Sequence, residues 1–244
     1  MKALIFAAGL GTRLKPITDS IPKALVPING KPLIQHIIEK LKKSGFDEII
    51  INVHHFPEQI IDFLKANYNF GIRIEISDER DELLDTGGGI RKAAWFFDDG
   101  KPFLVHNVDI LSNVDLAELY NQHILTNSLA TLVVSQRDTF RYLLFDENIR
   151  LNGWINEKTG ETKPTNLDKT KLYKKLAFSG IQILSPQVFE FMEKFVPTFP
   201  IMDFYLKNAA SQAINGFIPD NFNMLDVGKL NVLDEAEKFM TPNP

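Results

Sequence analysis

The chain has 244 residues, with 27 basic and 31 acidic side chains and no cysteine. A chain of this length can bury a large core, and an α/β unit of this size often forms one domain. The near balance of charge argues against a general attraction for nucleic acid, so any anion site must be local. The absence of cysteine excludes disulfides and thiolate zinc sites.

Hydrophobic segments along the chain are short. No apolar stretch approaches the roughly 20 residues that span a bilayer. The N-terminal apolar run leads into a glycine-bearing turn instead of a small-residue cleavage site. We therefore expect no membrane partner, no nucleic-acid partner and a cytoplasmic location, and the oligomeric state is left open.

The first part of the chain alternates strand-like and helix-like segments, as in a mostly parallel sheet covered by helices. The apolar patterns predict strands at 2–8, 48–53, 72–77 and 102–106. Helices are predicted at 32–43, 57–68 and 90–97. Together these segments indicate a doubly wound α/β unit.

After a predicted helix at 115–127, the pattern changes. Short strands are predicted at 130–135, 141–145 and 150–155, followed by a polar, irregular segment at 156–171. The remaining predictions are strands at 178–184, 214–219 and 223–227 and helices at 186–195, 202–213 and 230–240. This part is typical of an antiparallel, loop-rich half that covers the binding edge of the sheet.

A glycine-bearing turn follows the first predicted strand, at the end where open α/β sheets bind their ligands. Gly9 and Gly11 let backbone N–H groups approach a polyphosphate, and Arg13 and Lys23 can neutralise its charge. A P-loop would need a lysine directly after its second glycine, and a dinucleotide fingerprint would need a third glycine where Leu14 stands. Both motifs fit poorly.

The segment from Ala7 to Pro32 resembles the signature of the sugar nucleotidyltransferases, A-A-G-x-G-T-R-L-x-P-x-T-x-x-x-P-K-x-L-x-P-[IV]-x-G-x-P, with every named position present. The resemblance implies a Rossmann-like nucleotidyltransferase core with an antiparallel sugar-binding half. It implies that Arg13 and Lys23 are catalytic and that the nucleotide contacts Ala7, Ala8, Gly9, Gly11, Thr12, Arg13 and Lys23. The alternative is a strand-to-helix turn whose glycines and prolines serve backbone geometry alone, which would not require the two cations.

Two aspartates match the positions that hold the catalytic magnesium ion in this family. Asp109 follows the fourth predicted strand, and Asp226 lies in Leu225-Asp226-Val227-Gly228. Mg²⁺ takes one or two protein carboxylates and keeps other positions for phosphate and water. The chain departs from the family at Asn107-Val108-Asp109, where Gly-Asp is usual, and at Gly228-Lys229, where Gly-Thr or Gly-Ser is usual. Asn107 could crowd the metal, and Lys229 could displace the second ligand. Asp109 could instead cap a helix or turn, and Asp115, which matches no motif, is predicted to be a helix cap.

Two further segments resemble family elements that bind the base and the sugar. Leu84 to Ile90 resembles L-[ED]-T-[AG]-G-G-[IL], which implies nucleotide contacts from Thr86, Gly87 and Gly88 and a sugar contact from Asp85. The alternative is a tight helix N-terminus. Gly180 resembles the glycine of an F-[ST]-G-I strand beside the sugar, although glycine in a strand also marks a bulge.

Many family members grip the sugar phosphate with a Glu-Lys pair. Glu157-Lys158 has these letters but lies in a polar turn, so the cationic partner of the sugar phosphate stays unassigned.

The implied reaction joins an NTP to a sugar 1-phosphate, with release of pyrophosphate and Mg²⁺ as cofactor. The likeness is closest to the short, single-domain group that uses UTP and N-acetylmuramate 1-phosphate. Alternatives are GTP with mannose 1-phosphate, dTTP with glucose 1-phosphate, and a regulatory protein that senses nucleotide sugars. We expect one domain over 1–244, with a nucleotide-binding half at 1–110, a sugar-phosphate-binding half at 111–226 and a C-terminal helix within 227–244.

Overall fold

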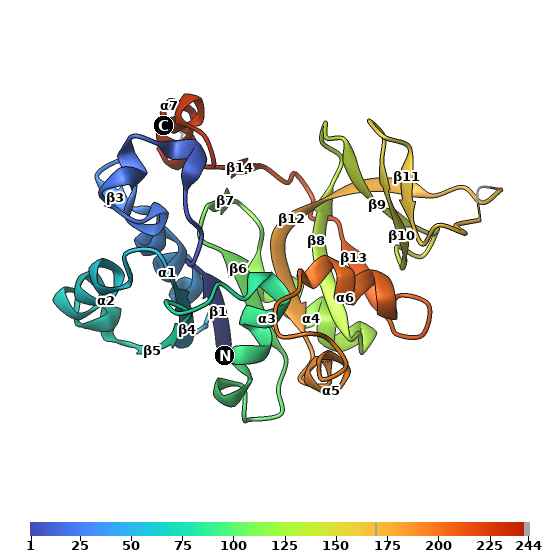
Figure 1. Ribbon diagram of the computed structural model, residues 1–244, viewed down its shortest axis with the longest axis horizontal. Coiled ribbons are helices and arrows are strands. Elements are labelled where there is room, and N and C mark those ends of the chain that lie inside the picture. Colours follow the sequence, from blue (N-terminus) through green and yellow to red (C-terminus); the bar gives the residue numbers. More distant parts are fainter. Residues whose placement is uncertain (169, 242–244) are drawn as a thin grey trace.

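The computed structural model describes residues 1–168 and 170–241. In this part of the chain a ten-stranded sheet runs in the order β11-β10-β9-β12-β6-β1-β4-β5, and β8 and β13 join it beside β12. Figure 1 shows the helix-covered strands on one side of the molecule and the antiparallel strands β9 to β11 on the other. A continuous sheet therefore links the two halves.

Parallel strands form the first half of this sheet: β1 (Lys2–Phe6), β4 (Glu48–Val53), β5 (Arg73–Asp78) and β6 (Phe103–Asn107). Leu4 of β1 pairs with Ile50 on one side and with Val105 on the other. The strand order therefore reverses direction at β1. Open α/β sheets bind ligands at such a reversal, beyond the carboxyl ends of the strands.

Helices cover both faces of the parallel strands, so these strands are apolar on both sides. Ala3 and Ile5 of β1 belong to one buried cluster, and Leu4 belongs to the other. Helices α1 (Leu33–Lys43), α2 (Pro57–Ala66), α4 (Leu116–Thr126) and α7 (Leu233–Met240) contribute to the first cluster. Helices α3 (Asp85–Lys92), α5 (Val188–Met192) and α6 (Ile201–Asn208) contribute to the second.

The second half is antiparallel and is attached through β12 (Lys174–Leu184), which pairs with β6 at Ile181 and His106. Strands β8 (Ala130–Ser135), β9 (Arg141–Phe145), β10 (Leu151–Asn156), β11 (Glu161–Lys163) and β13 (Ile214–Phe217) complete this half. Two short pairs lie apart from the main sheet. They are β7 (Ile110–Ser112) with β14 (Met224–Asp226), and β2 (Pro27–Ile28) with β3 (Lys31–Pro32).

The predicted α/β fold with an antiparallel half is confirmed. Asp115 caps α4 as predicted, because its carboxylate accepts hydrogen bonds from the N–H groups of Ala117 and Glu118 at 2.9 and 3.0 Å. None of the helices within the described residues is long and apolar enough to cross a membrane.

Several predicted boundaries were wrong. Helix α3 begins at Asp85 and contains the glycine run, whereas the sequence predicted a helix from residue 90. Strand β11 lies within the segment predicted to be irregular, of which residue 169 is outside the described residues. Strand β7 was not predicted, because three residues are too few to show an alternating pattern.

Candidate active site

The turn after β1 combines a strained position with an open one. Gly11 has a φ of +64°, and a Cβ there would lie 2.8 Å from the Cγ2 atom of Thr18. The Thr18 hydroxyl donates a hydrogen bond of 2.8 Å to the Gly11 carbonyl, which holds the turn closed. A Cβ on Gly9 would meet no atom within 4 Å. The turn therefore requires glycine at position 11 and leaves free space beside position 9.

That space belongs to a cavity of about 260 Å³ at the carboxyl ends of β1 and β6. It is lined by Ala7, Gly9, Gly11, Thr12, Arg13, Lys23, Val108, Asp109 and Gly228. Of the residues that the signature implied for the nucleotide phosphates, all but Ala8 line it. Ala8 is buried beside it. The cavity is therefore walled by backbone on one side and by two cations and a carboxylate on the other.

The two predicted metal ligands are brought together by the pairing of β7 with β14. Asp226 pairs with Ile110, and the N–H group of Val227 donates a hydrogen bond of 2.8 Å to the carbonyl of Asp109. Lys23 forms an ion pair with Asp109, and both side chains are largely buried. A Cβ on Gly228 would lie 2.7 Å from Oδ1 of Asp226 and 2.8 Å from Nη2 of Arg13. Residues from both ends of the chain thus meet at this edge of the sheet.

These carboxylates fit a hard divalent cation. Oδ1 of Asp226 is buried and has no hydrogen-bond partner within the described residues. A buried carboxylate oxygen in that state is costly unless a cation or a donor satisfies it. The described residues hold no group of three or more His, Asp or Glu side chains that could enclose a metal. Mg²⁺ tolerates so few protein ligands because it also binds phosphate oxygens and water.

The two departures from the family pattern do not disturb the carboxylates. A Cβ on Gly180 would lie 2.7 Å from Nδ2 of Asn107, so the Asn107 side chain faces β12. No salt bridge joins Lys229 to Asp226 in the described part of the chain. Neither Asn107 nor Lys229 therefore pairs with the carboxylate of Asp226.

A buried polar network connects the turn after β1 with the start of α3. The Asn52 side chain accepts a hydrogen bond from the N–H group of Ala7 at 2.7 Å and donates one to Glu79 at 2.9 Å. The other carboxylate oxygen of Glu79 accepts from the N–H group of Leu84 at 3.2 Å. Two side chains thus position the phosphate turn relative to the predicted base-binding segment.

The glycine run of α3 packs closely against the chain before α6. The N–H groups of Gly87 and Gly88 both donate to the carbonyl of Phe199, at 2.8 and 3.2 Å. A Cβ on Gly87 would lie 2.2 Å from the Phe199 ring. Thr86 accepts a hydrogen bond of 2.9 Å from the N–H group of Ile201, and Asp85 accepts one of 2.6 Å from Thr86. Close packing accounts for these glycines, and their contact with a base stays a prediction.

Gly180 lies in an irregular part of β12, as the alternative reading of this glycine expected. Its φ is +75°, and the pairing with β8 shifts between Phe178 and Gln182. The bulge lets β12 approach Asn107, two residues before Asp109. A direct contact of Gly180 with the sugar stays a prediction.

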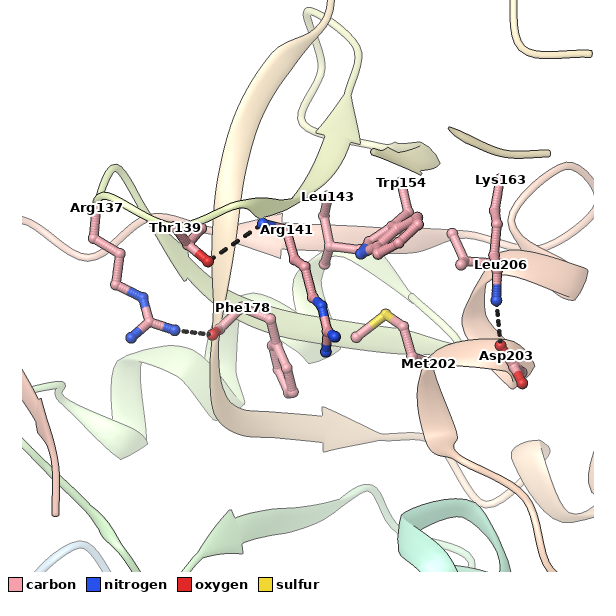
Figure 2. Close-up of a pocket in the computed structure, with 10 residues that line it drawn as sticks. All are labelled: Arg137, Thr139, Arg141, Leu143, Trp154, Lys163, Phe178, Met202, Asp203 and Leu206. Atoms are coloured by element: carbon pink, nitrogen blue, oxygen red, sulfur yellow. Dashed lines mark hydrogen bonds and ion pairs between the residues drawn. The ribbon is translucent and has the colours of Figure 1, made fainter. Parts of the chain in front are cut away.

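A second cavity, of about 400 Å³, lies between the antiparallel strands and α6 (Figure 2). Its lining residues are Arg137, Thr139, Arg141, Leu143, Trp154, Lys163, Phe178, Met202, Asp203 and Leu206. Sequence reasoning missed this cavity because its residues come from five separate segments, of which only the one with Phe178 belongs to a family motif, F-[ST]-G-I. A second local signal was the spacing of Arg141 and Leu143, which places them on one face of a strand.

Comparison with known proteins agrees with this geometry. A family model described as nucleotidyl transferase matches residues 2–242. The chain is 34% identical over 200 residues to N-acetylmuramate alpha-1-phosphate uridylyltransferase of Neisseria meningitidis serogroup B, an alignment that covers 79% of each protein. It is 33% identical over 235 residues to mannose-1-phosphate guanylyltransferase 1 of Arabidopsis thaliana, which covers 94% of this chain and 62% of the plant protein. The chain thus spans less than two thirds of the plant relative's length.

Solved structures share the fold. A putative glucose-1-phosphate thymidylyltransferase from Bacillus anthracis, in complex with sucrose, has a TM-score of 0.82 at 18% identity and covers 100% of this chain and 97% of its own. HddC from Yersinia pseudotuberculosis, complexed with GMP-PN, has a TM-score of 0.78 at 23% identity, covering 98% of this chain and 99% of its own. With a family match over almost its whole length, the chain belongs to the nucleotidyl transferase family.

Proposed function

We propose that the protein transfers a nucleoside monophosphate from an NTP to a sugar 1-phosphate and releases pyrophosphate. The observation that carries the proposal is the meeting of Asp109 and Asp226 beside the turn that holds Arg13 and Lys23. A backbone-walled cavity lined by Arg13, Lys23 and Asp109, with Asp226 next to its lining residue Gly228, suits a polyphosphate with a divalent cation. The names of the relatives agree with this class of reaction.

The chemistry needs no covalent enzyme intermediate. An oxygen of the sugar phosphate attacks the α-phosphorus of the NTP in line, and the bond from that phosphorus to the pyrophosphate oxygen breaks. Arg13, Lys23 and the N–H groups of the turn neutralise the charge that accumulates on the phosphate oxygens. A magnesium ion held by Asp109 and Asp226 would supply Lewis-acid stabilisation of the same charge.

The preferred substrates are a finer part of the proposal. UTP with N-acetylmuramate 1-phosphate is the favoured pair, supported by a relative of that name that aligns over 79% of each chain. GTP with mannose 1-phosphate is the principal alternative, because a relative of that name aligns over 94% of this chain. A third candidate is dTTP with glucose 1-phosphate. Pyrophosphate release, assayed with each NTP against each sugar phosphate and with and without a chelator, separates these pairs.

The metal site has a sharper test in Asp226→Asn. The substitution keeps the shape of the side chain but removes the charge, so we expect the protein to fold and to lose Mg²⁺-stimulated pyrophosphate release by about a hundredfold or more. Asp234→Asn changes an exposed carboxylate on α7 and serves as the matched control. Thermal unfolding of both variants checks that they are folded.

Two results would contradict the proposal. Undiminished turnover of Asp226→Asn would exclude this carboxylate from the metal site. Tight nucleotide binding by the wild-type protein, without magnesium-stimulated turnover for any substrate pair, would favour the regulatory alternative.

A further inference from the structure

The cavity in the antiparallel half adjoins both parts of the candidate active site. Phe178 lines it and lies two residues before Gly180, the glycine that packs against Asn107 near Asp109. Met202 also lines it and follows Ile201, whose N–H group donates to Thr86 at the start of α3. A molecule in this cavity would therefore lie between the acidic edge of the sheet and α3.

The charge of the cavity is positive. Arg137, Arg141 and Lys163 face a single carboxylate, Asp203. Lys163 already lies 3.4 Å from Asp203, and Arg137 donates a hydrogen bond of 3.1 Å to the carbonyl of Phe178 (Figure 2). The guanidinium of Arg141 has neither an ion pair nor a hydrogen bond within residues 1–168 and 170–241. A guanidinium presents paired N–H donors that match the oxygens of a phosphate.

An apolar wall lies on the same face of the sheet as Arg141. Leu143 is two residues from Arg141 on β9 and pairs with Trp154 of β10 and with Leu176 of β12. Trp154 pairs in turn with Lys163 of β11. Because paired residues in a sheet point to one face, these side chains form a continuous floor beside the free arginine. The C–H face of a sugar ring can pack on a flat aromatic surface of this kind.

Glu157 and Lys158, which have the letters of the family's Glu-Lys pair, make their contacts outside this cavity. Glu157 forms a salt bridge of 2.8 Å with Lys175, and the ammonium group of Lys158 lies 6.0 Å from the centre of the Phe140 ring. Neither residue lines the cavity beside Phe178. The anion of a sugar phosphate therefore needs another cation.

We propose that Arg141 binds the phosphate of the sugar 1-phosphate and that Trp154 supports its sugar ring. The inference rests on the proposed function, because it assigns the acceptor of that reaction to the second cavity. Arg141 contributes a charge and two parallel donors to the phosphate. Trp154 contributes apolar contact and favours a pyranose over a small acyclic phosphate.

Kinetics of Arg141→Ala test the first assignment. Loss of a charge-assisted hydrogen bond should raise KM for the sugar phosphate about 10- to 100-fold, while KM for the NTP stays within about twofold. Arg141→Lys should recover only part of the loss, because a lysine keeps the charge but not the paired donors. Arg150→Ala is the matched control, since Arg150 is an exposed arginine that bonds to the Gln212 carbonyl and lines no part of this cavity. An equal rise in both KM values, or no rise for the sugar phosphate, overturns the assignment.

Fluorescence tests the second assignment. The chain has two tryptophans, so Trp95→Phe leaves Trp154 as the only indole. Addition of the sugar phosphate to this variant should shift or quench its emission in a saturable manner, and addition of inorganic phosphate should not. An unchanged spectrum at saturating sugar phosphate, in a variant with wild-type turnover, overturns the role of Trp154.

Failure of the proposed function has a different signature. If no substrate pair is turned over, calorimetry with glucose 1-phosphate, mannose 1-phosphate and N-acetylmuramate 1-phosphate replaces kinetics. Binding to the wild-type protein that weakens in Arg141→Ala supports the sugar-phosphate site even where nucleotidyl transfer is absent. Absence of binding by all three compounds overturns the site. Turnover with unaltered KM in Arg141→Ala overturns the inference alone.

Discussion

Gly9 and Gly11 lie in one turn, yet a methyl group at each would have a different effect. At Gly11 the left-handed backbone disfavours any side chain by about 1–2 kcal/mol, and the methyl would also meet Thr18. Gly11→Ala should therefore lower the free energy of unfolding by at least that amount. At Gly9 a methyl would meet no protein atom, so Gly9→Ala should unfold like the wild-type protein, within about 0.5 kcal/mol.

The pair of variants separates folding from binding. The added methyl of Gly9→Ala would enter the cavity of about 260 Å³ in which the nucleotide phosphates are proposed to bind. We expect KM for the NTP to rise while the denaturation midpoint stays constant. Chemical denaturation and steady-state kinetics on both variants supply the two measurements. Normal nucleotide kinetics in a folded Gly9→Ala would place the phosphates elsewhere.

At the scale of elements, Asn52 joins β1, β4 and the loop before α3 through two buried hydrogen bonds. Asn52→Ala would leave the N–H group of Ala7 and one Glu79 oxygen without partners. Each unpaired buried group costs about 1–3 kcal/mol, so urea denaturation should show a loss of that size or more. We also expect a higher KM for the NTP, because the phosphate turn loses its connection to the segment before α3.

Ser77→Ala is the control for this experiment. Ser77 is buried and pairs with Asn52 across β4 and β5, but its hydroxyl has no partner within the described residues. Its removal should change stability little. If the two variants lose equal stability, the hydrogen bonds of Asn52 are not what holds these elements together.

Local patterns predicted most of the elements and the phosphate turn. The parallel strands were evident as short apolar runs, and the signature specified the turn residue by residue. Asp226 could be matched to a motif, but its approach to Asp109 depends on pairing between β14 and β7, each only three residues long. Such short strands carry almost no periodicity. The alignment of these two aspartates therefore required the structure.

The glycine run of α3 shows a different limit of sequence reasoning. Consecutive glycines indicated bare backbone, and the sequence left open what would lie against it. The structure puts the ring of Phe199 against Gly87 and the carbonyl of Pro197 against Gly88. That contact joins segments more than a hundred residues apart, and no local pattern reports it. The cavity of Arg141 is likewise formed by several segments, four from consecutive strands or the loop before them and one from α6, and no single local pattern joins them.

At the scale of the whole molecule, the candidate site depends on segments from both ends of the chain. Strand β14 returns to β7 and carries Asp226 (Figure 1). Helix α7 then packs near β2, and Asn29, which follows β2, donates a hydrogen bond of 2.7 Å to the carbonyl of Glu237. The N-terminal turn supplies the cations, and the C-terminal segment supplies a carboxylate. Formation of the site therefore requires the turn after β1, β7 and β14 together.

Buried histidines give the whole fold a predictable response to acid. Burial lowers the pKa of His106 to about 3 and the pKa of His123 to about 4. Both are neutral in the folded protein, whereas in the unfolded chain a histidine takes up a proton near pH 6.5. The stability that comes from keeping these two histidines neutral is therefore fully present above about pH 6.5. At lower pH the free energy of unfolding should decrease by about 1.4 kcal/mol per pH unit for each histidine.

This acid response can be measured between pH 6.5 and 5, where most carboxylates stay ionised. His123 bonds to the hydroxyls of Thr131 and Ser185 at 2.9 and 3.0 Å, and an amide side chain can also donate and accept. His123→Gln should therefore reduce the dependence of the unfolding free energy on pH by about 1.4 kcal/mol per unit, as followed by urea denaturation. His55→Gln, at a partly exposed position, is the control and should leave most of the dependence in place. An unaltered pH dependence in His123→Gln would mean that the buried ring accepts its proton without unfolding.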